Sequence, residues 1–134
     1  MPNILIVEDN VSYAAILAFI LKEHGYRVKT AFTGKEAIDM VATENFDAII
    51  VDHWMPDLNG IETIRVLRNQ GCKSGVILLT ALIPWEVENK IDGLDVWKII
   101  EKSSVEKVIL DEIQNAVEFT QMNKEPNSSE KSLL

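Results

Sequence analysis

The stretch that decides the fold is Asp47-Ala48-Ile49-Ile50-Val51-Asp52-His53-Trp54-Met55-Pro56-Asp57-Leu58-Asn59-Gly60, an apolar run that ends on a carboxylate. Its apolar part, Ala48–Val51, is typical of a strand that is buried on both faces, as in a parallel sheet. A proline, an asparagine and a glycine then favour a turn that leads into a helix. Asp52 is therefore expected at the carboxyl end of a core strand, the edge of an open α/β sheet where ligands bind.

Length and composition indicate one globular domain with its own core. The chain has 134 residues, of which 47% are hydrophobic, so a packed core is expected and global disorder is not. The net charge of −8 argues against direct nucleic-acid binding and against an anionic membrane surface, but it is compatible with a bound cation. Cys72 is the one cysteine, which excludes an intrachain disulfide and fits a reducing compartment.

Neither a membrane span nor a secretion signal is evident. No segment approaches the roughly 20 consecutive apolar residues that a helix needs to cross a bilayer. The start, Met1-Pro2-Asn3-Ile4, has no basic region ahead of an apolar one. We therefore expect a cytoplasmic protein.

Four further segments predict strands, and three of them also end on polar side chains. They are Ile4–Val7, followed by Glu8-Asp9; Arg27–Ala31, which is expected nearer a sheet edge; Val76–Leu79, followed by Thr80-Ala81; and Val96–Ile100, followed by Glu101-Lys102. Because the carboxyl ends of parallel strands lie along one edge of a sheet, these polar residues are expected to meet there.

Apolar residues at helical spacing follow each strand and predict five helices. The first begins after Asn10 or Ser12 and ends at Gly25, the second is capped by Thr33, the third runs from Gly60 to Gly71, the fourth is a short helix from Trp85 to about Ile91 with Pro84 in its first turn, and the last is capped by Ser103 or Ser104. Strands that alternate with helices predict a parallel sheet covered on both faces. Residues 1–122 are expected to form this domain, and residues 123–134 a polar, flexible tail.

The polar residues that end the strands have the composition of a phosphoryl-transfer site. Glu8, Asp9 and Asp52 would meet Thr80 and Lys102 in one crevice. Clustered carboxylates repel one another and raise at least one pKa, which a cation would relieve. Oxygen ligands with room for water suit Mg²⁺. A metal, a lysine and a hydroxyl around a carboxylate nucleophile are what phosphoryl transfer needs, and the product would be an aspartyl phosphate.

These residues carry a resemblance to a known family. From about Asn3 to Thr120, the chain resembles the receiver domain of bacterial two-component response regulators. The resemblance depends on four motifs: the acidic pair Glu8-Asp9, Asp52-x-x-Met55-Pro56 with Gly60, Thr80-Ala81, and Lys102. It implies an α/β fold of the flavodoxin-like (βα)5 type, a doubly wound parallel sheet of five strands in the order 2-1-3-4-5.

The resemblance also implies a role for each residue of the acidic cluster. Asp52 would be the phosphoacceptor. Asp9 and Asp52 would bind Mg²⁺ directly, Glu8 would act through a water molecule, and the backbone carbonyl of Trp54 would complete the protein's ligands. Thr80 would be the switch hydroxyl that moves to bind the phosphoryl group.

The lysine of this family could be matched to either of two residues. We prefer Lys102, because the apolar residues of the last helix then fall in the family's phase, with Ile113 facing inward. Lys98 would place its ammonium in the middle of a strand, before Ile99-Ile100. Lys102 is therefore expected to form the ion pair with the phosphoryl group.

The sequence departs from the family's pattern at three places. Ser103 replaces the proline that usually follows the lysine, and that proline's peptide bond is often cis. Ile99 replaces an aromatic switch residue. A small Gly-Ala pair is expected before the fifth strand, where this chain has Gly93-Leu94-Asp95-Val96-Trp97. The fourth helix and the fifth strand are the family's usual output face, so signalling through that face is expected to be unusual.

Two positions beside the phosphoacceptor control the access of water in this family. They correspond to Trp54 and Leu82, which are both large and apolar. Trp54 could instead pack on its own loop. His53 points away from Asp52 by strand alternation, and we interpret it as structural.

Three functions are compatible with these residues. The leading hypothesis is a signalling switch and not a conventional enzyme. It would accept a phosphoryl group from a phosphohistidine of a histidine kinase or phosphotransfer protein. Phosphorylation would then change its binding to an unknown output partner. The alternatives are a Mg²⁺-dependent phosphohydrolase and a pseudo-receiver binding module; such hydrolases usually place a second acid where Trp54 stands. Because no DNA-binding segment follows the last helix, we expect a stand-alone receiver or the first domain of a longer protein, as a monomer or weak dimer.

Overall fold

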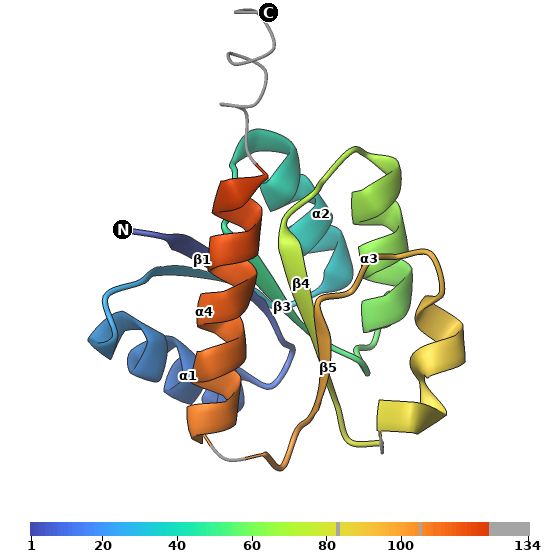
Figure 1. Ribbon diagram of the computed structural model, residues 1–134. Helices are drawn as coiled ribbons and strands as arrows, with labels where there is room; N and C mark the ends of the chain where they lie inside the picture. Colours follow the sequence, from blue (N-terminus) through green and yellow to red (C-terminus); the bar gives the residue numbers. More distant parts are fainter. Residues whose placement is uncertain (83, 105, 124–134) are drawn as a thin grey trace, which may run out of the picture.

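The computed structural model describes residues 1–82, 84–104 and 106–123, which form a five-stranded parallel sheet between two pairs of helices (Figure 1). The strands are β1 (Asn3–Val7), β2 (Arg27–Ala31), β3 (Ala48–Asp52), β4 (Gly75–Thr80) and β5 (Lys98–Glu101). Their order in the sheet is β2-β1-β3-β4-β5, and all neighbours are parallel. The predicted strand number and order are confirmed.

Two helices cover each face of the sheet. α1 (Val11–Glu23) and α4 (Glu106–Met122) lie on one face, and α2 (Gly34–Thr43) and α3 (Gly60–Asn69) lie on the other (Figure 1). Because successive strand residues point to opposite faces, each strand contributes to both apolar layers. In β3, Ile50 packs on the α1 and α4 side, whereas Ile49 and Val51 pack on the α2 and α3 side.

The central position of β3 fixes the place of Asp52. All residues of β3 and β4 are buried, as the continuous apolar runs predicted. The edge strands β2 and β5 have exposed residues instead. Asp52 thus ends a strand that is held by neighbours on both sides, so its backbone is firmly placed.

Side chains at the helix ends match the predicted caps. Asn10, and not Ser12, caps α1 by accepting a hydrogen bond from the Tyr13 amide at 3.0 Å, and Thr33 caps α2 through the Glu36 amide. Gly25 follows α1 with φ +89°, which favours glycine. At α3 the cap, which was not predicted, is a reciprocal pair between Asn59 and Glu62.

The prediction of an α-helix from Trp85 to about Ile91 is wrong. The structure has two short 3-10 turns there, Pro84–Glu86 and Glu88–Ile91. Val87 is the fully buried side chain of this segment, Trp85 is exposed, and the second turn has no side-chain cap. One buried residue cannot supply the apolar stripe that stabilises a helix against the sheet.

The ends of the last two elements also differ from the prediction. β5 begins at Lys98 rather than Val96, because Asp95 adopts a left-handed conformation with φ +53° just before it. α4 begins at Glu106, and the residue before it lies outside the described residues, so the predicted cap at Ser103 or Ser104 stays a prediction. The predicted tail from residue 124 also lies outside them. No described helix is long and apolar enough to cross a membrane.

Candidate functional site

The carboxyl ends of four strands bring the predicted polar residues together. Asp52 and Thr80 are the last residues of β3 and β4, Glu8 and Asp9 follow β1, and Lys102 follows β5. One carboxylate oxygen from each of Glu8, Asp9 and Asp52 lies within 4.8 Å of the other two. Glu8 and Asp52 are buried while Asp9 is exposed, so the cluster opens to solvent on the Asp9 side.

The ammonium of Lys102 lies inside this cluster. Its Nζ is 2.8 Å from Glu8 Oε1 and 3.2 Å from Asp52 Oδ1, and it lies 4.6 Å from the centre of the Tyr13 ring. Its backbone amide donates to the Thr80 carbonyl at 2.6 Å, which ties the residue to the end of β4. Lys98, the other candidate, instead pairs with α4, where its ammonium lies 3.8 Å from Glu112.

Burial and the neighbouring charges have opposite effects on the pKa of each ionisable group in the site. Burial raises the pKa of Glu8 and of Asp52, and Lys102 offsets part of that rise. For Lys102, burial works to lower the pKa, but the two carboxylates outweigh it and the pKa is raised. The lysine therefore stays charged at neutral pH, and its ammonium pairs with Glu8 and Asp52, two of the three carboxyl groups of the cluster.

The donor set fits a divalent cation of the Mg²⁺ type. All three side chains offer carboxylate oxygens, which Mg²⁺ prefers, and the exposed side leaves room for its water molecules. Glu8 Oε1 is buried, and the Lys102 ammonium lies 2.8 Å from it. An ionised carboxylate has about four lone-pair sites, so Glu8 can accept a further cationic partner or a water molecule beside the lysine.

The loop after Asp52 is held by two contacts that connect it to both neighbouring helices. The amide of Gly60 donates to the His53 carbonyl at 2.8 Å, and a Cβ at Gly60 would lie 2.3 Å from the Asp52 carbonyl oxygen, so only glycine fits. The carboxylate of Asp57 accepts hydrogen bonds from the amides of Gly34 and Lys35 at the start of α2. Sequence reasoning missed Asp57, because its partners are more than 20 residues away and no local pattern marks them.

Thr80 does not direct its hydroxyl toward the acidic cluster. Its Oγ1 lies 3.1 Å from His53 Nδ1 and accepts a hydrogen bond from the Leu82 amide at 3.0 Å. The buried His53 side chain therefore contacts Thr80, and strand alternation places it on the face of the sheet opposite to Asp52. Its hydrogen bond to Thr80 was not predicted. Burial lowers the pKa of His53, so the ring is neutral at physiological pH.

The two positions proposed to control water access differ in exposure. Trp54 is 56% exposed, and its ring stacks on His53 with the centroids 4.5 Å apart. Leu82 is partly buried against the α2 and α3 layer, and so is Ile99. Every described peptide bond is trans, including the bond between Lys102 and Ser103.

Comparison with known proteins identifies relatives along most of the chain. The family model described as the response regulator receiver domain matches residues 4–114. The response regulator MprA of Mycolicibacterium vanbaalenii is 38% identical over 96 residues, which are 71% of this chain and 41% of that protein. An uncharacterized transcriptional regulatory protein of Bacillus subtilis, YkoG, is 36% identical over 94 residues, which are 70% of this chain and 40% of that protein. The chain thus spans about 40% of the length of these curated relatives.

Solved structures share the fold over nearly their whole length. The receiver domain of the Francisella response regulator 1452 superposes with a TM-score of 0.84 at 28% identity, covering 90% of this chain and 99% of that one. TrrA of Thermotoga maritima, solved in complex with Mg²⁺ and BeF, superposes with a TM-score of 0.79 at 27% identity, covering 87% and 99%.

Proposed function

Because the chain belongs to the response regulator receiver family, we propose that it is a signalling switch that carries its phosphoryl group on Asp52. The observation that carries this proposal is the position of Asp52 at the end of a buried strand, with the Lys102 ammonium 3.2 Å from its Oδ1. Two further carboxylates and a threonine stand at the ends of the neighbouring strands. The relatives match only this domain, so the output of the whole protein is part of the proposal.

In the proposed reaction Asp52 is the nucleophile. A carboxylate oxygen of Asp52 attacks the phosphorus of a phosphohistidine, the oxygen–phosphorus bond forms, and the phosphorus–nitrogen bond breaks. The electron pair of the broken bond stays on the donor imidazole, which then takes up a proton. The protein's part is to position the groups and to stabilise charge on the transferred phosphoryl oxygens.

Lys102 and Thr80 are proposed to bind the phosphoryl group after transfer. The Lys102 ammonium already lies between Glu8 and Asp52, so a small movement would bring it to a phosphoryl oxygen. Thr80 would have to release its present partners before its hydroxyl could donate to the same group. These two movements would carry the signal away from Asp52.

The acidic cluster is proposed to hold Mg²⁺. Asp9 and Asp52 would bind the ion directly, Glu8 through a water molecule, and the backbone carbonyl of Trp54 would supply the remaining protein ligand. When bound, the ion would neutralise charge on the phosphoryl oxygens during transfer. The oxygen donors within 4.8 Å of one another support this assignment.

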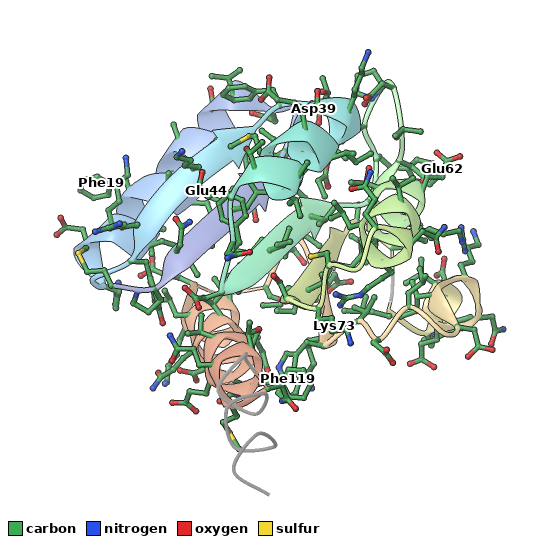
Figure 2. The ribbon with its side chains drawn as sticks, turned by 90° about the horizontal axis from the view of Figure 1, so that it is seen from above. Phe19, Asp39, Glu44, Glu62, Lys73 and Phe119 are labelled. Carbon is green, nitrogen blue, oxygen red and sulfur yellow. The ribbon has the colours of Figure 1, made fainter. Side chains whose placement is uncertain are left out.

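The phosphoryl donor is proposed to bind on α1, beside the acidic cluster. This helix begins two residues after Asp9 and exposes the apolar side chains of Val11, Ile16 and Phe19, the last of them 66% exposed. Figure 2 shows Phe19 at the periphery of the fold. A partner that covered this face would bring its phosphohistidine close to Asp52 while burying apolar surface. The donor class is a histidine kinase or a phosphotransfer protein.

A phosphohydrolase that turns over an external substrate is a weaker alternative. Such enzymes usually carry a second acid two residues after the nucleophile, where this chain has Trp54. The Trp54 ring stacks on a neutral histidine and offers only an N–H donor, so it cannot serve as a general base. We therefore assign to the protein only the transfer to its own Asp52 and the slow hydrolysis of the product.

Labelling with a small phosphodonor tests the assignment of Asp52. In acetyl phosphate and Mg²⁺, intact-mass spectrometry is expected to show one hydroxylamine-labile phosphoryl group on the wild type and none on Asp52→Asn, because an amide cannot attack. Asp57→Asn is the matched control, since it removes an acid from the same loop and is expected to leave labelling intact. If Asp52→Asn still gained a phosphoryl group on an acidic residue, the assignment would be wrong.

A further inference from the structure

His53 is a buried polar side chain that the proposed phosphoryl transfer does not use. Only 2% of its surface is exposed. Its amide donates to the Leu79 carbonyl at 2.8 Å, and its carbonyl accepts from the Gly60 amide at 2.8 Å. Its backbone is therefore held on both sides, and the ring has little freedom to move from its place beside β4.

The register of the sheet places His53 next to Thr80. β3 and β4 pair Asp52 with Leu79, so the residues that follow these two, His53 just after β3 and Thr80 at the end of β4, are neighbours on the α2 and α3 face. Asp52 and Leu79 point to the opposite face. The Thr80 hydroxyl, 3.1 Å from His53 Nδ1, is thus held on the side of the sheet away from the phosphoacceptor.

From this geometry we propose that His53 is a positioning residue that holds the Thr80 hydroxyl in its resting orientation and so opposes the switch. The proposal rests on the proposed function, because it concerns the movement of Thr80 toward a phosphoryl group on Asp52. To make that movement, the hydroxyl must leave His53 Nδ1 and the Leu82 amide. The side chain of His53 then loses the one hydrogen-bond partner that it has among the described residues.

Both consequences of the movement disfavour the active state in the wild type. A buried ring nitrogen without a partner costs free energy, and so does the lost hydrogen bond. Leucine at this position would have no polar atom to leave unpaired, and it would remove a partner of the resting hydroxyl. The variant His53→Leu is therefore expected to favour the active state.

Beryllofluoride, a phosphoryl mimic that binds with Mg²⁺, provides the measurement. We expect His53→Leu to bind it about fivefold more tightly than the wild type by isothermal titration, which corresponds to about 1 kcal/mol. His53→Asn is expected to keep wild-type affinity, because its side-chain amide can place a polar atom where Nδ1 lies in histidine and can hydrogen-bond the Thr80 hydroxyl. His24→Leu is the matched control: His24 is the other histidine, is exposed, and hydrogen-bonds its own helix at the Ile20 carbonyl, so its loss is expected to change nothing.

A mutant cycle separates this role from a general effect on packing. In a Thr80→Ala background the hydroxyl is absent, and His53→Leu is expected to have no effect on beryllofluoride affinity. An equal gain in both backgrounds, or no gain in either, would overturn the proposal.

A second readout distinguishes this proposal from the proposed function. The three-bond couplings of Thr80, measured by NMR without beryllofluoride, are expected to show rotamer averaging in His53→Leu but not in His53→Asn; a fixed rotamer in His53→Leu would overturn the resting contact. If the wild type and Asp52→Asn bound beryllofluoride equally, the assignment of Asp52 as phosphoacceptor would fail. The three-bond couplings of Thr80 would still decide whether His53 holds its hydroxyl.

Discussion

The Lys102 ammonium lies closer to Glu8 Oε1, at 2.8 Å, than to Asp52 Oδ1, at 3.2 Å. Glu8 is almost fully buried, so the lysine is the cation that makes its charged form tolerable in the resting protein. If the acidic cluster holds Mg²⁺ as proposed, the same lysine would compete with the ion for it, since both are cations at one place. We therefore expect Lys102 to raise the stability of the fold and to lower the affinity of the proposed site for Mg²⁺.

Lys102→Met is expected to lower the melting temperature without Mg²⁺ and to increase the rise that Mg²⁺ produces. Breaking a fully buried pair costs about 3–5 kcal/mol, and because 26% of this lysine side chain is exposed we expect a loss nearer 2 kcal/mol. Thermal melts with and without Mg²⁺ measure both effects. Lys98→Met, which removes a lysine from the same region with a long contact to Glu112, is the control and should change neither. Equal Mg²⁺-dependent rises in Lys102→Met and wild type would contradict the competition.

Asp52→Asn is expected to stabilise the metal-free protein at neutral pH. Burial raises the pKa of Asp52 above its ordinary 3.8, so the folded state binds this proton more tightly than the unfolded state does. Stability is therefore lost as the pH rises from about 3.8 through the raised pKa, and it stays lost above that range. Asparagine cannot ionise, so the variant avoids the loss and should melt a few degrees higher at pH 7, with the difference shrinking toward pH 4. A variant that melted lower than wild type at pH 7 without metal would show the carboxylate to be stabilising.

Asp57→Asn is expected to show the opposite dependence on pH. Burial works to raise the pKa of Asp57, but hydrogen bonds from the amides of Leu58, Lys35 and Gly34 hold it below its ordinary 3.8. Its charge thus contributes stability above pH 3.8 that is lost as the pH falls through the lowered pKa. Because Asp57 is exposed, the loss at pH 7 should be only about 0.3–1 kcal/mol, the range for an exposed charge at a helix N-terminus. Denaturant unfolding at pH 7 and pH 3 measures it, and equal losses at both would exclude a charge effect.

The strand ends could be predicted because they depend on short-range patterns. Buried parallel strands have continuous apolar runs, so Asp52 and Thr80 mark the ends of β3 and β4 in the sequence itself. Parallel topology then places those ends along one edge without any knowledge of side-chain contacts. The same reasoning failed for Trp85 to Ile91, where a proline and scattered apolar residues resemble a helix, but only Val87 is fully buried.

The contacts across strands could not be predicted from the sequence. Alternation gives the face of His53 but not its neighbour on β4, which depends on a register that pairs Asp52 with Leu79. Likewise, no spacing rule connects Asp57 to the start of α2, because that contact exists only once both helices pack on the sheet. Long-range register is the information that was missing in both cases.

If the exposed apolar face of α1 is the docking surface for the phosphoryl donor, a substitution there should slow transfer from protein donors only. Phe19→Ser should slow phosphoryl transfer from the cognate histidine kinase or phosphotransfer protein about tenfold, which corresponds to about 1.4 kcal/mol of lost contact. Transfer from acetyl phosphate should be unchanged, because a small donor needs no docking surface. Figure 2 labels a matched control, Phe119, an exposed phenylalanine that lies on α4 and contacts Trp97 instead.

Two outcomes would separate docking from other effects in this comparison. If Phe119→Ser slowed the protein donor as much as Phe19→Ser did, the loss would follow from apolar surface in general. If Phe19→Ser slowed acetyl phosphate equally, α1 would act on the chemistry of the site and not on the partner.

The lifetime of the phosphoryl group is expected to depend on Trp54 and Leu82. Hydrolysis needs a water molecule in line with the bond between phosphorus and the Asp52 oxygen. Leu82 has no polar side-chain atom, and the indole of Trp54 can donate a hydrogen bond but cannot accept one from that water. We therefore expect slow hydrolysis, and we expect the double variant Trp54→Asn with Leu82→Glu to speed it. A tenfold gain corresponds to about 1.4 kcal/mol of barrier, a size that suits the positioning of one water molecule.

The stacking of Trp54 on His53 makes this a test with two distinct outcomes. The indole of Trp54 stacks on the His53 ring. From that position it either blocks the path by which water reaches the phosphoryl group or leaves that path open. Phosphate loss after removal of the donor should be measured in wild type, in each single variant and in the double variant. Trp85→Asn, which replaces another exposed tryptophan on a 3-10 turn, is the control and should decay like wild type. If Leu82→Glu alone accounted for the whole gain, the stack would hold Trp54 clear of the water, and equal decay in all variants would mean that neither side chain gates it.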